Sequence, residues 1–334
     1  DVSSNTALTY LNIGQNQLTS LDVSANTALT NLICVGNQLT SLDVSNNTAL
    51  THLDCYYNQL TTLDVSANTA LTILGCAFNQ LTSLDVSANT ALTYLDCQEN
   101  ELTSLDVSSN TALTYLNCTS NNQLTSLDVS LNTALTWLDC GDCQLTTLDV
   151  SNNTVLSTLN CYQNQLTSLD VSSNTALTYL NCGSNQLTSL DVSSNTAVTT
   201  LECPSNQLAS LDVSSNTALT SLYCGYNQLT SLDLSANTAE NFVLDCREQQ
   251  LSSINFPPNL YSVEAHGNPL GSLDMSSFTS LYNLGCNSCE LTYLNIKNGN
   301  QLTLLSVTSN DDLTCIETLD PAYATENWTY ANGN

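Results

Sequence analysis

The sequence predicts a β-rich solenoid, a stack of similar coils, and three observations support this. A 21-residue unit repeats from DVSSNTALTYLNIGQNQLTSL at Asp1 and keeps its phase to Leu232, with one extra residue around Asn121 and Asn122. Less regular units of 22, 19, 21 and 22 residues then run to Ile316. No regular unit has helical spacing, and β-branched and turn residues dominate it. A fixed period of this size indicates coils that bury their apolar faces only against their neighbours.

One half of each unit predicts a short strand. In LTYLDC the alternation of side chains points Leu92, Leu95 and Cys97 inward, and Tyr94 and Asp96 outward. An asparagine follows in most units, where the chain turns, and its amide can satisfy backbone groups of adjacent coils. These turn asparagines are Asn16, Asn37, Asn58, Asn79, Asn100, Asn164, Asn185, Asn206 and Asn227.

The other half of the unit, LTSLDVS, predicts a second extended segment with Leu and Val inward and Ser and Asp outward. The N-T-A turn then returns the chain to the next L-T. We therefore expect two narrow parallel sheets joined by tight turns, with almost no helix.

The spacing L-x-x-L-x-C-x-x-N-x-L, as in Leu50, Leu53, Cys55, Asn58 and Leu60, resembles the leucine-rich repeat. The resemblance covers residues 1–316 and implies a right-handed leucine-rich-repeat solenoid of about fifteen coils. Because LTSLDVSAN fits the same template again, the unit resembles a bacterial subclass with nested half-repeats. The tail DDLTCIETLDPAYATENWTY is similar to the end of secreted leucine-rich-repeat proteins from Bacteroidetes-type bacteria.

The repeat pattern also predicts the domain organisation. We expect one solenoid over 1–316, with regular coils over 1–232 and degenerate coils over 233–316. Residues 317–334, with Pro321, Tyr323, Trp328 and Tyr330, are expected to form a C-terminal cap, because a stack exposes its core at each end. The sequence opens in the middle of a unit, so we expect a leader and an N-terminal cap to be missing.

Most of the fifteen cysteines recur with the repeat and are predicted to be buried packing thiols. In-register neighbours lie about 4.8 Å apart, farther than a disulfide prefers. Cys143 and Cys289 replace the turn asparagine, and the pairs Cys140/Cys143 and Cys286/Cys289 only superficially resemble half zinc sites. The twelve stacked cysteines are Cys34, Cys55, Cys76, Cys97, Cys118, Cys140, Cys161, Cys182, Cys203, Cys224, Cys246 and Cys286.

The charge is strongly acidic, with thirty Asp and Glu against Arg247 and Lys297. Such a surface repels nucleic acid and anionic lipid, and no stretch of eighteen apolar residues predicts membrane insertion. The two histidines, His52 and His266, lie many coils apart, so no catalytic Ser-His-Asp set is expected and the chain is predicted not to be an enzyme.

A row of aspartates in LTSLDVS leaves two alternatives open. Either neighbouring Ser and Thr hydroxyls satisfy the carboxylates, or cations such as calcium lie between coils. The second alternative is weaker, because no glycine-rich calcium loop accompanies the row, and we predict no cofactor. The row comprises Asp22, Asp43, Asp64, Asp85, Asp106, Asp128, Asp149, Asp170, Asp191, Asp212, Asp233 and Asp274.

Comparison between units separates a constant face, LTSLDVS, from a variable one, the outward positions of LTxLxCxx. The variable positions are rich in aromatic residues, whose ring faces could cover a sugar or a partner's side chain, with carboxylates and amides beside them. The candidate binding residues are His52, Asp54, Tyr56, Tyr57, Phe78, Tyr94, Asp96, Tyr115, Asn117, Trp137, Asp139, Tyr162 and Tyr179.

These observations favour an extracellular or cell-surface module for binding or adhesion that recognises a glycan or a protein. Ligand binding on the strand face is also what the family resemblance implies. The alternative is a structural spacer without a specific ligand, in which stacked aromatic residues only stabilise the sheet, by about 0.2–1 kcal/mol per pair. The sequence does not indicate an oligomeric state.

Overall fold

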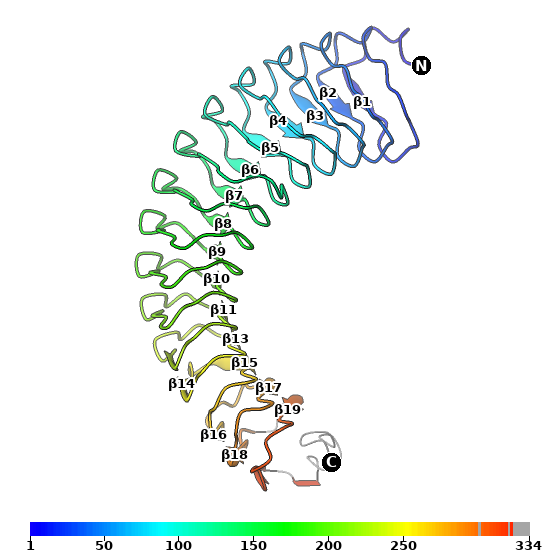
Figure 1. Ribbon diagram of the computed structural model, residues 1–334. Helices are drawn as coiled ribbons and strands as arrows, with labels where there is room; N and C mark the ends of the chain where they lie inside the picture. Colours follow the sequence, from blue (N-terminus) through cyan, green and yellow to red (C-terminus); the bar gives the residue numbers. More distant parts are fainter. Residues whose placement is uncertain (300–301, 320, 323–334) are drawn as a thin grey trace. The chain divides into compact units, whose positions relative to one another are not determined.

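The computed structural model describes residues 1–299, 302–319 and 321–322. The chain forms a leucine-rich-repeat β-solenoid of about 15 turns, with parallel sheets and almost no helix, as predicted. It divides into two compact units, Asp1–Asn174 and Thr175–Asn334, and successive coils stack in each of them (Figure 1). No helix among the described residues is long and apolar enough to cross a membrane.

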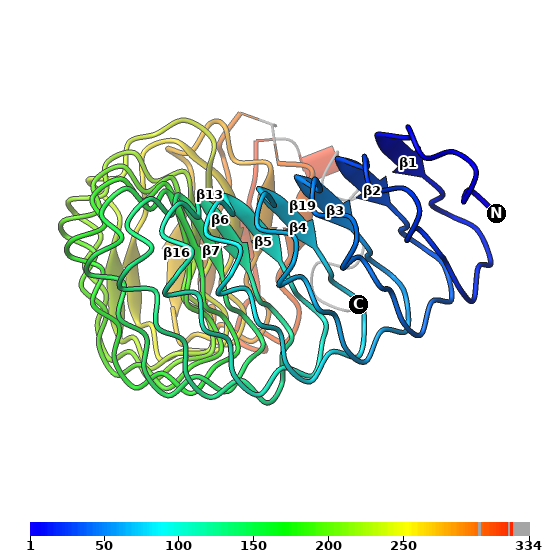
Figure 2. The same ribbon diagram turned by 90° about the horizontal axis from the view of Figure 1, so that it is seen from above.

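In the first unit, every coil contributes one three-residue strand, and successive strands pair in parallel. The register is that of the 21-residue repeat, for example Tyr94 opposite Tyr115. The strands lie side by side along one side of the coils (Figure 2). Their bounds are β1 Tyr10–Asn12, β2 Asn31–Ile33, β3 His52–Asp54, β4 Ile73–Gly75, β5 Tyr94–Asp96, β6 Tyr115–Asn117, β7 Trp137–Asp139 and β8 Thr158–Asn160.

The second unit continues this pattern but becomes irregular. Its main strands are β9 Tyr179–Asn181, β10 Thr200–Glu202, β11 Ser221–Tyr223, β13 Phe242–Asp245, β15 Leu260–Glu264, β17 Asn283–Gly285 and β19 Leu304–Ser306. These strands pair in that order, with a register shift between β13 and β15 at Phe242/Val243. Two smaller parallel sheets are β12 Ser231–Asp233 with β14 Ser253–Asn255, and β16 Ser272–Asp274 with β18 Tyr293–Asn295 and β20 Ile316–Glu317.

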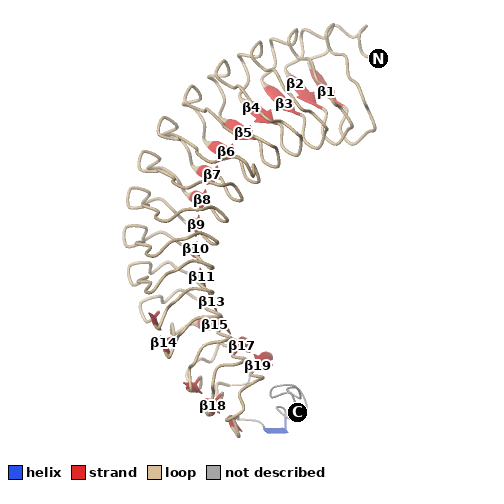
Figure 3. Cartoon of the chain, viewed as in Figure 1, coloured by secondary structure: helices blue, strands red, loops and turns tan. Residues whose placement is uncertain are grey.

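The second sheet differs from the prediction in the regular coils. The smaller sheets occur only from Ser231 onward, whereas the LTSLDVS segments of the first unit contain no strand (Figure 3). In these segments an aspartate side chain accepts the hydrogen bond of a backbone N–H two residues later, as from Ser45 to Asp43 at 2.9 Å. The extended segments therefore bury Leu and Val as predicted. However, hydrogen bonds within each coil replace part of the backbone hydrogen bonding that would join neighbouring strands in a sheet.

A ladder of asparagine side chains connects the coils, as the sequence predicts. The Asn58 Nδ2 donates to the carbonyls of Cys34 (3.0 Å) and Cys55 (3.1 Å), and its Oδ1 accepts from the N–H of Leu39 (3.1 Å). One amide thus contacts three backbone groups in two coils. Each carbonyl also accepts from a second ladder amide, Asn37 or Asn79, whereas the Leu39 N–H would lie unpaired in the interior without Asn58.

Two coils replace this asparagine with cysteine, and the backbone compensates. In the coil before Cys143, the Leu124 N–H donates to the Asn121 carbonyl at 2.8 Å instead of to a ladder amide. The residue inserted at Asn122 permits this tighter turn. The Cys143 thiol in turn lies 3.5 Å from the Cys118 carbonyl, and its hydrogen bond with the Cys118 thiol lowers the pKa of Cys143. Cys118 and Cys143 therefore contact each other between adjacent coils, which the sequence did not indicate.

The twelve stacked cysteines are free and buried. The thiol donates to a carbonyl of the next coil where geometry permits, as from Cys34 to Asp54 and from Cys97 to Asn117, both at 3.5 Å. Burial raises the pKa of Cys34, Cys182 and Cys224 to about 12. These thiols are therefore protonated at neutral pH and unreactive as nucleophiles.

A thiol reagent should therefore distinguish one cysteine from the others. In the native protein the exposed Cys315 should react rapidly and the buried cysteines slowly, whereas all fifteen should react after denaturation. Colorimetric thiol titration, with Cys315→Ser as the control, measures this directly. Several stacked cysteines reacting at the rate of Cys315 would contradict the assignment of a closed interior.

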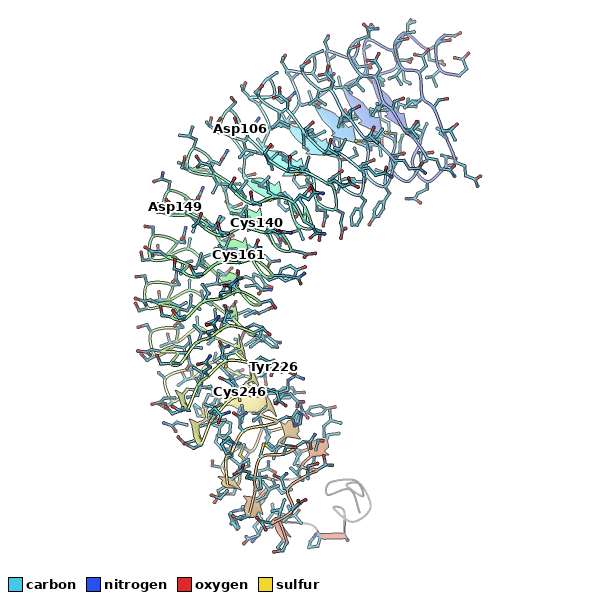
Figure 4. The ribbon with its side chains drawn as sticks, in the orientation of Figure 1. Asp106, Cys140, Asp149, Cys161, Tyr226 and Cys246 are labelled. Atoms are coloured by element: carbon cyan, nitrogen blue, oxygen red, sulfur yellow. The ribbon has the colours of Figure 1, made fainter. Side chains whose placement is uncertain are left out.

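The aspartate row lies on the side of the coils opposite the strands. Asp106 and Asp149 are at that edge, and Cys140 and Cys161 lie nearer the strands (Figure 4). The Asp22 carboxylate accepts hydrogen bonds from the Ser24 hydroxyl (2.6 Å) and N–H (2.9 Å), and these bonds lower the pKa of Asp22. The geometry therefore favours satisfaction by serine, the first of the two alternatives. Among the described residues no group of three or more His, Cys, Asp or Glu could hold a metal ion.

Candidate binding face

The strand face of the first unit consists of the outward side chains of β1–β8 and of the residues that follow each strand. At its centre, the strands β5, β6 and β7 begin with Tyr94, Tyr115 and Trp137. Because these strands are in register, the rings stack, with centroids 4.3 Å apart for Tyr94 and Tyr115 and 5.8 Å apart for Tyr115 and Trp137. The leucines between the outward positions are buried, so the core holds the stack in place.

The next outward row, predicted to present carboxylates and amides, is largely covered. Asp96 is only 5% exposed and Asn117 is 7% exposed. Asp139 accepts hydrogen bonds from the Asn160 side chain (3.0 Å), the Gly141 N–H (3.1 Å) and the Thr119 hydroxyl. This row therefore serves mainly to fix the loops after the strands.

Tyr56 crosses an entire coil to reach Asp96. Its hydroxyl donates to Asp96 Oδ2 at 3.3 Å, two coils away. The ring can lie in this way because β4 ends in Gly75, where any Cβ would collide with the ring of Tyr56 and with Asp54. Burial first, and then the charge of Asp96, raise the pKa of Tyr56. The glycine makes room for this ring, a structural role that the sequence pattern did not single out.

A second aromatic pair occupies backbone positions that bulky residues seldom adopt. Tyr57 and Phe78 have φ of 53° and 52°, in the left-handed region, and their rings stack at 4.2 Å. Gly36 occupies the corresponding position one coil earlier, with φ of 66°. A side chain in this region costs about 1–2 kcal/mol, and Tyr57 is nevertheless 54% exposed. The same position is left-handed in most other coils, for example at Gln15, Ser184 and Ser205, so this conformation belongs to the repeat and not to the aromatic residues.

The remaining predicted residues divide into those at the site and one outside it. The His52 Nε2 lies 2.7 Å from Asp54 Oδ2, on the same strand as predicted. Tyr162 covers Gly141 from the next coil. Tyr179 belongs to the second unit, where its hydroxyl donates to Glu202 at 3.0 Å.

The second unit holds a patch that the sequence reasoning did not identify. Tyr261 and Tyr282 stack with centroids 5.4 Å apart, and His266 Nε2 lies 2.6 Å from Glu264. The two tyrosines are one repeat apart, but the degenerate phase of these coils hid their common position. Their spacing of 21 residues is the signal that could have revealed them.

The stacking changes what the first unit can bind. We expected open ring faces, but both faces of Tyr115 are turned toward its neighbours in the stack. Trp137 ends the stack beside the short Thr158 of β8 and remains 40% exposed. The stack therefore presents ring edges, hydroxyls and one indole face to a partner, on a rigid framework.

These features define a class of protein, a leucine-rich-repeat solenoid with one variable, aromatic face. A family model described as Leucine Rich repeats (2 copies) matches residues 90–132. The solved functional domain of InlJ from Listeria monocytogenes, which includes a cysteine ladder, is 39% identical. The alignment covers 92% of this chain and 70% of that one, with a TM-score of 0.84. The chain therefore belongs to the leucine-rich-repeat family, and its coils are of the internalin type.

More distant structures share the fold alone. An internalin (inlF) from Listeria monocytogenes is 23% identical, over 76% of this chain and 88% of that one, with a TM-score of 0.61. The ectodomain of the receptor kinase GASSHO1/SCHENGEN3 from Arabidopsis thaliana, solved in complex with CASPARIAN STRIP INTEGRITY FACTOR 2, is 20% identical. It matches 93% of this chain and 44% of that one, with a TM-score of 0.70. A search of curated proteins found no match.

Proposed function

We propose that the chain is a non-catalytic binding module, extracellular or on the cell surface, that recognises a protein or a glycan through the strand face of its first unit. The observation that carries the proposal is the aromatic arrangement on that face. Tyr94, Tyr115 and Trp137 are held in register by strands, and a second pair, Tyr57 and Phe78, stacks in the turns that follow β3 and β4. Large, rigid aromatic side chains are typical of binding hot spots.

Two further observations support this proposal. A plant receptor ectodomain that shares this fold was solved in complex with CASPARIAN STRIP INTEGRITY FACTOR 2, which supports a binding role for a solenoid of this kind. The internalin-type relatives and the secreted-type tail support a surface location, although most of residues 317–334 lie outside the described part of the chain. Because most ring faces of the stack are already occupied, a protein partner fits this face better than a sugar stacked on the rings.

The alternative, a structural spacer, is favoured by the stacking itself. Stacked aromatic pairs on adjacent strands stabilise a sheet even where no ligand binds to them. The two functions differ in one expectation, since a spacer should lose stability but no affinity when an exposed ring is removed.

Trp137→Ala should therefore weaken binding by about 2 kcal/mol while the fold stays intact, because the indole points away from the core. The measurement is binding of the wild-type protein and the variant to arrays of glycans and of extracellular proteins, followed by calorimetry on any ligand found. Ser221→Ala, a change on β11 in the second unit, is the control and should leave affinity unchanged. If a ligand is found and neither substitution affects it, the spacer becomes the better interpretation.

A further inference from the structure

Cys143 differs from the other interior cysteines in its position and in its access to solvent. It takes the place of the turn asparagine after β7 and does not belong to the stack of twelve. Of the buried cysteines that the structure describes, Cys143 alone keeps exposed surface, at 6%, whereas the others, Cys118 and Cys140 among them, are at 0%. A small solute can therefore reach the Cys143 thiol but not the stacked thiols.

The Cys143 thiol lies against Cys118 of the preceding coil. Its Sγ is 3.5 Å from the Cys118 carbonyl, and the two thiols are hydrogen-bonded to each other. Stacked cysteines of adjacent coils are kept apart by the spacing of in-register strands. Cys143 approaches Cys118 from the turn, 25 residues along the chain, so this spacing does not separate the two sulfur atoms.

The backbone does not depend on the proton of the Cys143 thiol. This S–H contacts the carbonyls of Cys118 (3.5 Å) and Gly141 (3.4 Å). The Cys118 carbonyl also accepts from Asn121 Nδ2 at 2.8 Å, and the Gly141 carbonyl accepts from the Ser120 N–H at 3.0 Å. Because both carbonyls keep another donor, loss of the thiol proton leaves no buried backbone group unpaired.

The two thiols differ in how readily they ionise. The hydrogen bond with the Cys118 thiol lowers the pKa of Cys143, against the opposing effects of burial and of the charges of Asp142 and Asp139. The same hydrogen bond, and then burial, raise the pKa of Cys118. Cys143 is therefore the thiol of the pair that becomes a nucleophile, and Cys118 stays protonated beside it.

We propose that Cys143 and Cys118 form an oxidant-responsive pair, which hydrogen peroxide converts to a disulfide between the coils of β6 and β7. The Cys143 sulfur attacks one peroxide oxygen, the O–O bond breaks, and the departing hydroxide takes the thiol proton to form water, which leaves Cys143 as a sulfenic acid. The Cys118 sulfur then attacks the Cys143 sulfur. The S–S bond forms, the S–O bond breaks, and the hydroxyl leaves as water with the Cys118 proton.

The net reaction oxidises two thiols by two electrons and reduces one peroxide to two waters. The bridge joins the coils that carry Tyr115 and Trp137 of the aromatic stack. The proposal does not depend on the binding function proposed above, because it concerns the interior beneath that face.

A second pair of cysteines provides a comparison within the chain. Cys289 also replaces a turn asparagine, and its thiol is hydrogen-bonded to that of Cys286 in the same coil. Its Sγ lies 3.2 Å from the carbonyl of Ala265 in the preceding coil, where no thiol is available. Cys289 is at 0% exposure. This pair has the thiol contact without access from solvent, so we expect it to stay reduced in the native protein.

The test is treatment of the full native chain with hydrogen peroxide, in the variant Cys315→Ser, which removes the exposed thiol from the count. The remaining thiols are then alkylated in denaturant, and the chain is digested with a protease that cleaves before aspartate. Because Asp128, Asp139 and Asp142 separate the cysteines, this protease places Cys118, Cys140 and Cys143 on three peptides that mass spectrometry distinguishes.

We expect the loss of two titratable thiols, one disulfide that joins Cys118 to Cys143, and recovery of both thiols with dithiothreitol. In the same background, Cys143→Ser should keep all of its thiols reduced under the same treatment. Cys140→Ala is the matched control and should still form the bridge. Circular dichroism checks the fold of both variants, and the peptide map of the Cys315→Ser chain decides the pairing even where a core variant does not fold.

A disulfide between Cys140 and Cys143 would overturn the proposal, as would Cys143 oxidised to sulfinic acid without a bridge. Complete retention of all thiols would overturn it as well. Oxidation of Cys286 and Cys289 at the same rate would show that the exposed surface of Cys143 does not select the site, and would equally contradict the proposal. The proposed binding function is unaffected by each of these outcomes.

Discussion

Replacing Asn100 by alanine should lower the free energy of unfolding by about 3–5 kcal/mol. The Asn100 amide donates to the carbonyls of Cys76, Cys97 and Gln98, each at 3.1 Å, and accepts from the Leu81 N–H at 3.0 Å. Alanine leaves the Leu81 N–H unpaired in the interior, where water does not replace the amide, and it leaves the Cys76 carbonyl with one donor, Asn79 Nδ2 at 3.1 Å, in place of two. Chemical denaturation followed by circular dichroism measures the loss.

Cys143→Ala is the matched control, because it changes the same ladder position two coils further on. There the Leu124 N–H already donates to the Asn121 carbonyl, so the substitution leaves no backbone N–H without a hydrogen-bond acceptor. Its effect should stay below about 1.5 kcal/mol. Equal effects of the two substitutions would show that the ladder amide matters for its volume and not for its hydrogen bonds.

Leu116→Ala should destabilise the protein by about 2–5 kcal/mol. Leu116 lies on β6 between Tyr115 and Asn117, and its side chain is fully buried, so alanine leaves a cavity directly beneath the aromatic stack. Because each coil contacts mainly its neighbours, the loss should concentrate in the adjoining coils. Hydrogen exchange resolved along the chain should show faster exchange there than in distant coils.

Leu131→Ala provides the control with the same chemical change. Leu131 is 56% exposed in the turn after the aspartate row, so its truncation should alter stability by less than about 0.5 kcal/mol. A comparable loss at both positions would mean that the alternation of buried and exposed positions in the repeat does not determine stability.

The repeat made most of the fold predictable. A period of 21 residues with alternating Leu and Cys determines the coils, the in-register strands and the interior, because each position recurs in the same environment. The second sheet could not be predicted correctly, since whether an extended LTSLDVS segment pairs with its neighbour depends on competing bonds such as that from Ser45 to Asp43. The cap predicted over 317–334 remains a prediction, because most of it lies outside the described residues.

The candidate site was predictable in its composition but not in its geometry. Alternation placed Tyr94, Tyr115 and Trp137 in one outward row, as the structure has them. Alternation alone could not show that the rings would cover one another, or that Asp96 would be buried beneath Tyr56. Those facts depend on rotamers and on the missing side chain of Gly75, neither of which follows a period.

The central claim is that the strand face of the first unit, and not another surface, meets the partner. Hydroxyl-radical footprinting of the aromatic side chains, with and without the bound ligand, tests it directly. The account predicts that Tyr94, Tyr115 and Trp137 become protected in the complex, while Tyr226 of the second unit, exposed by 51%, reacts as before. Unchanged labelling of the three stacked residues in a saturated complex would contradict the account and place the binding site elsewhere.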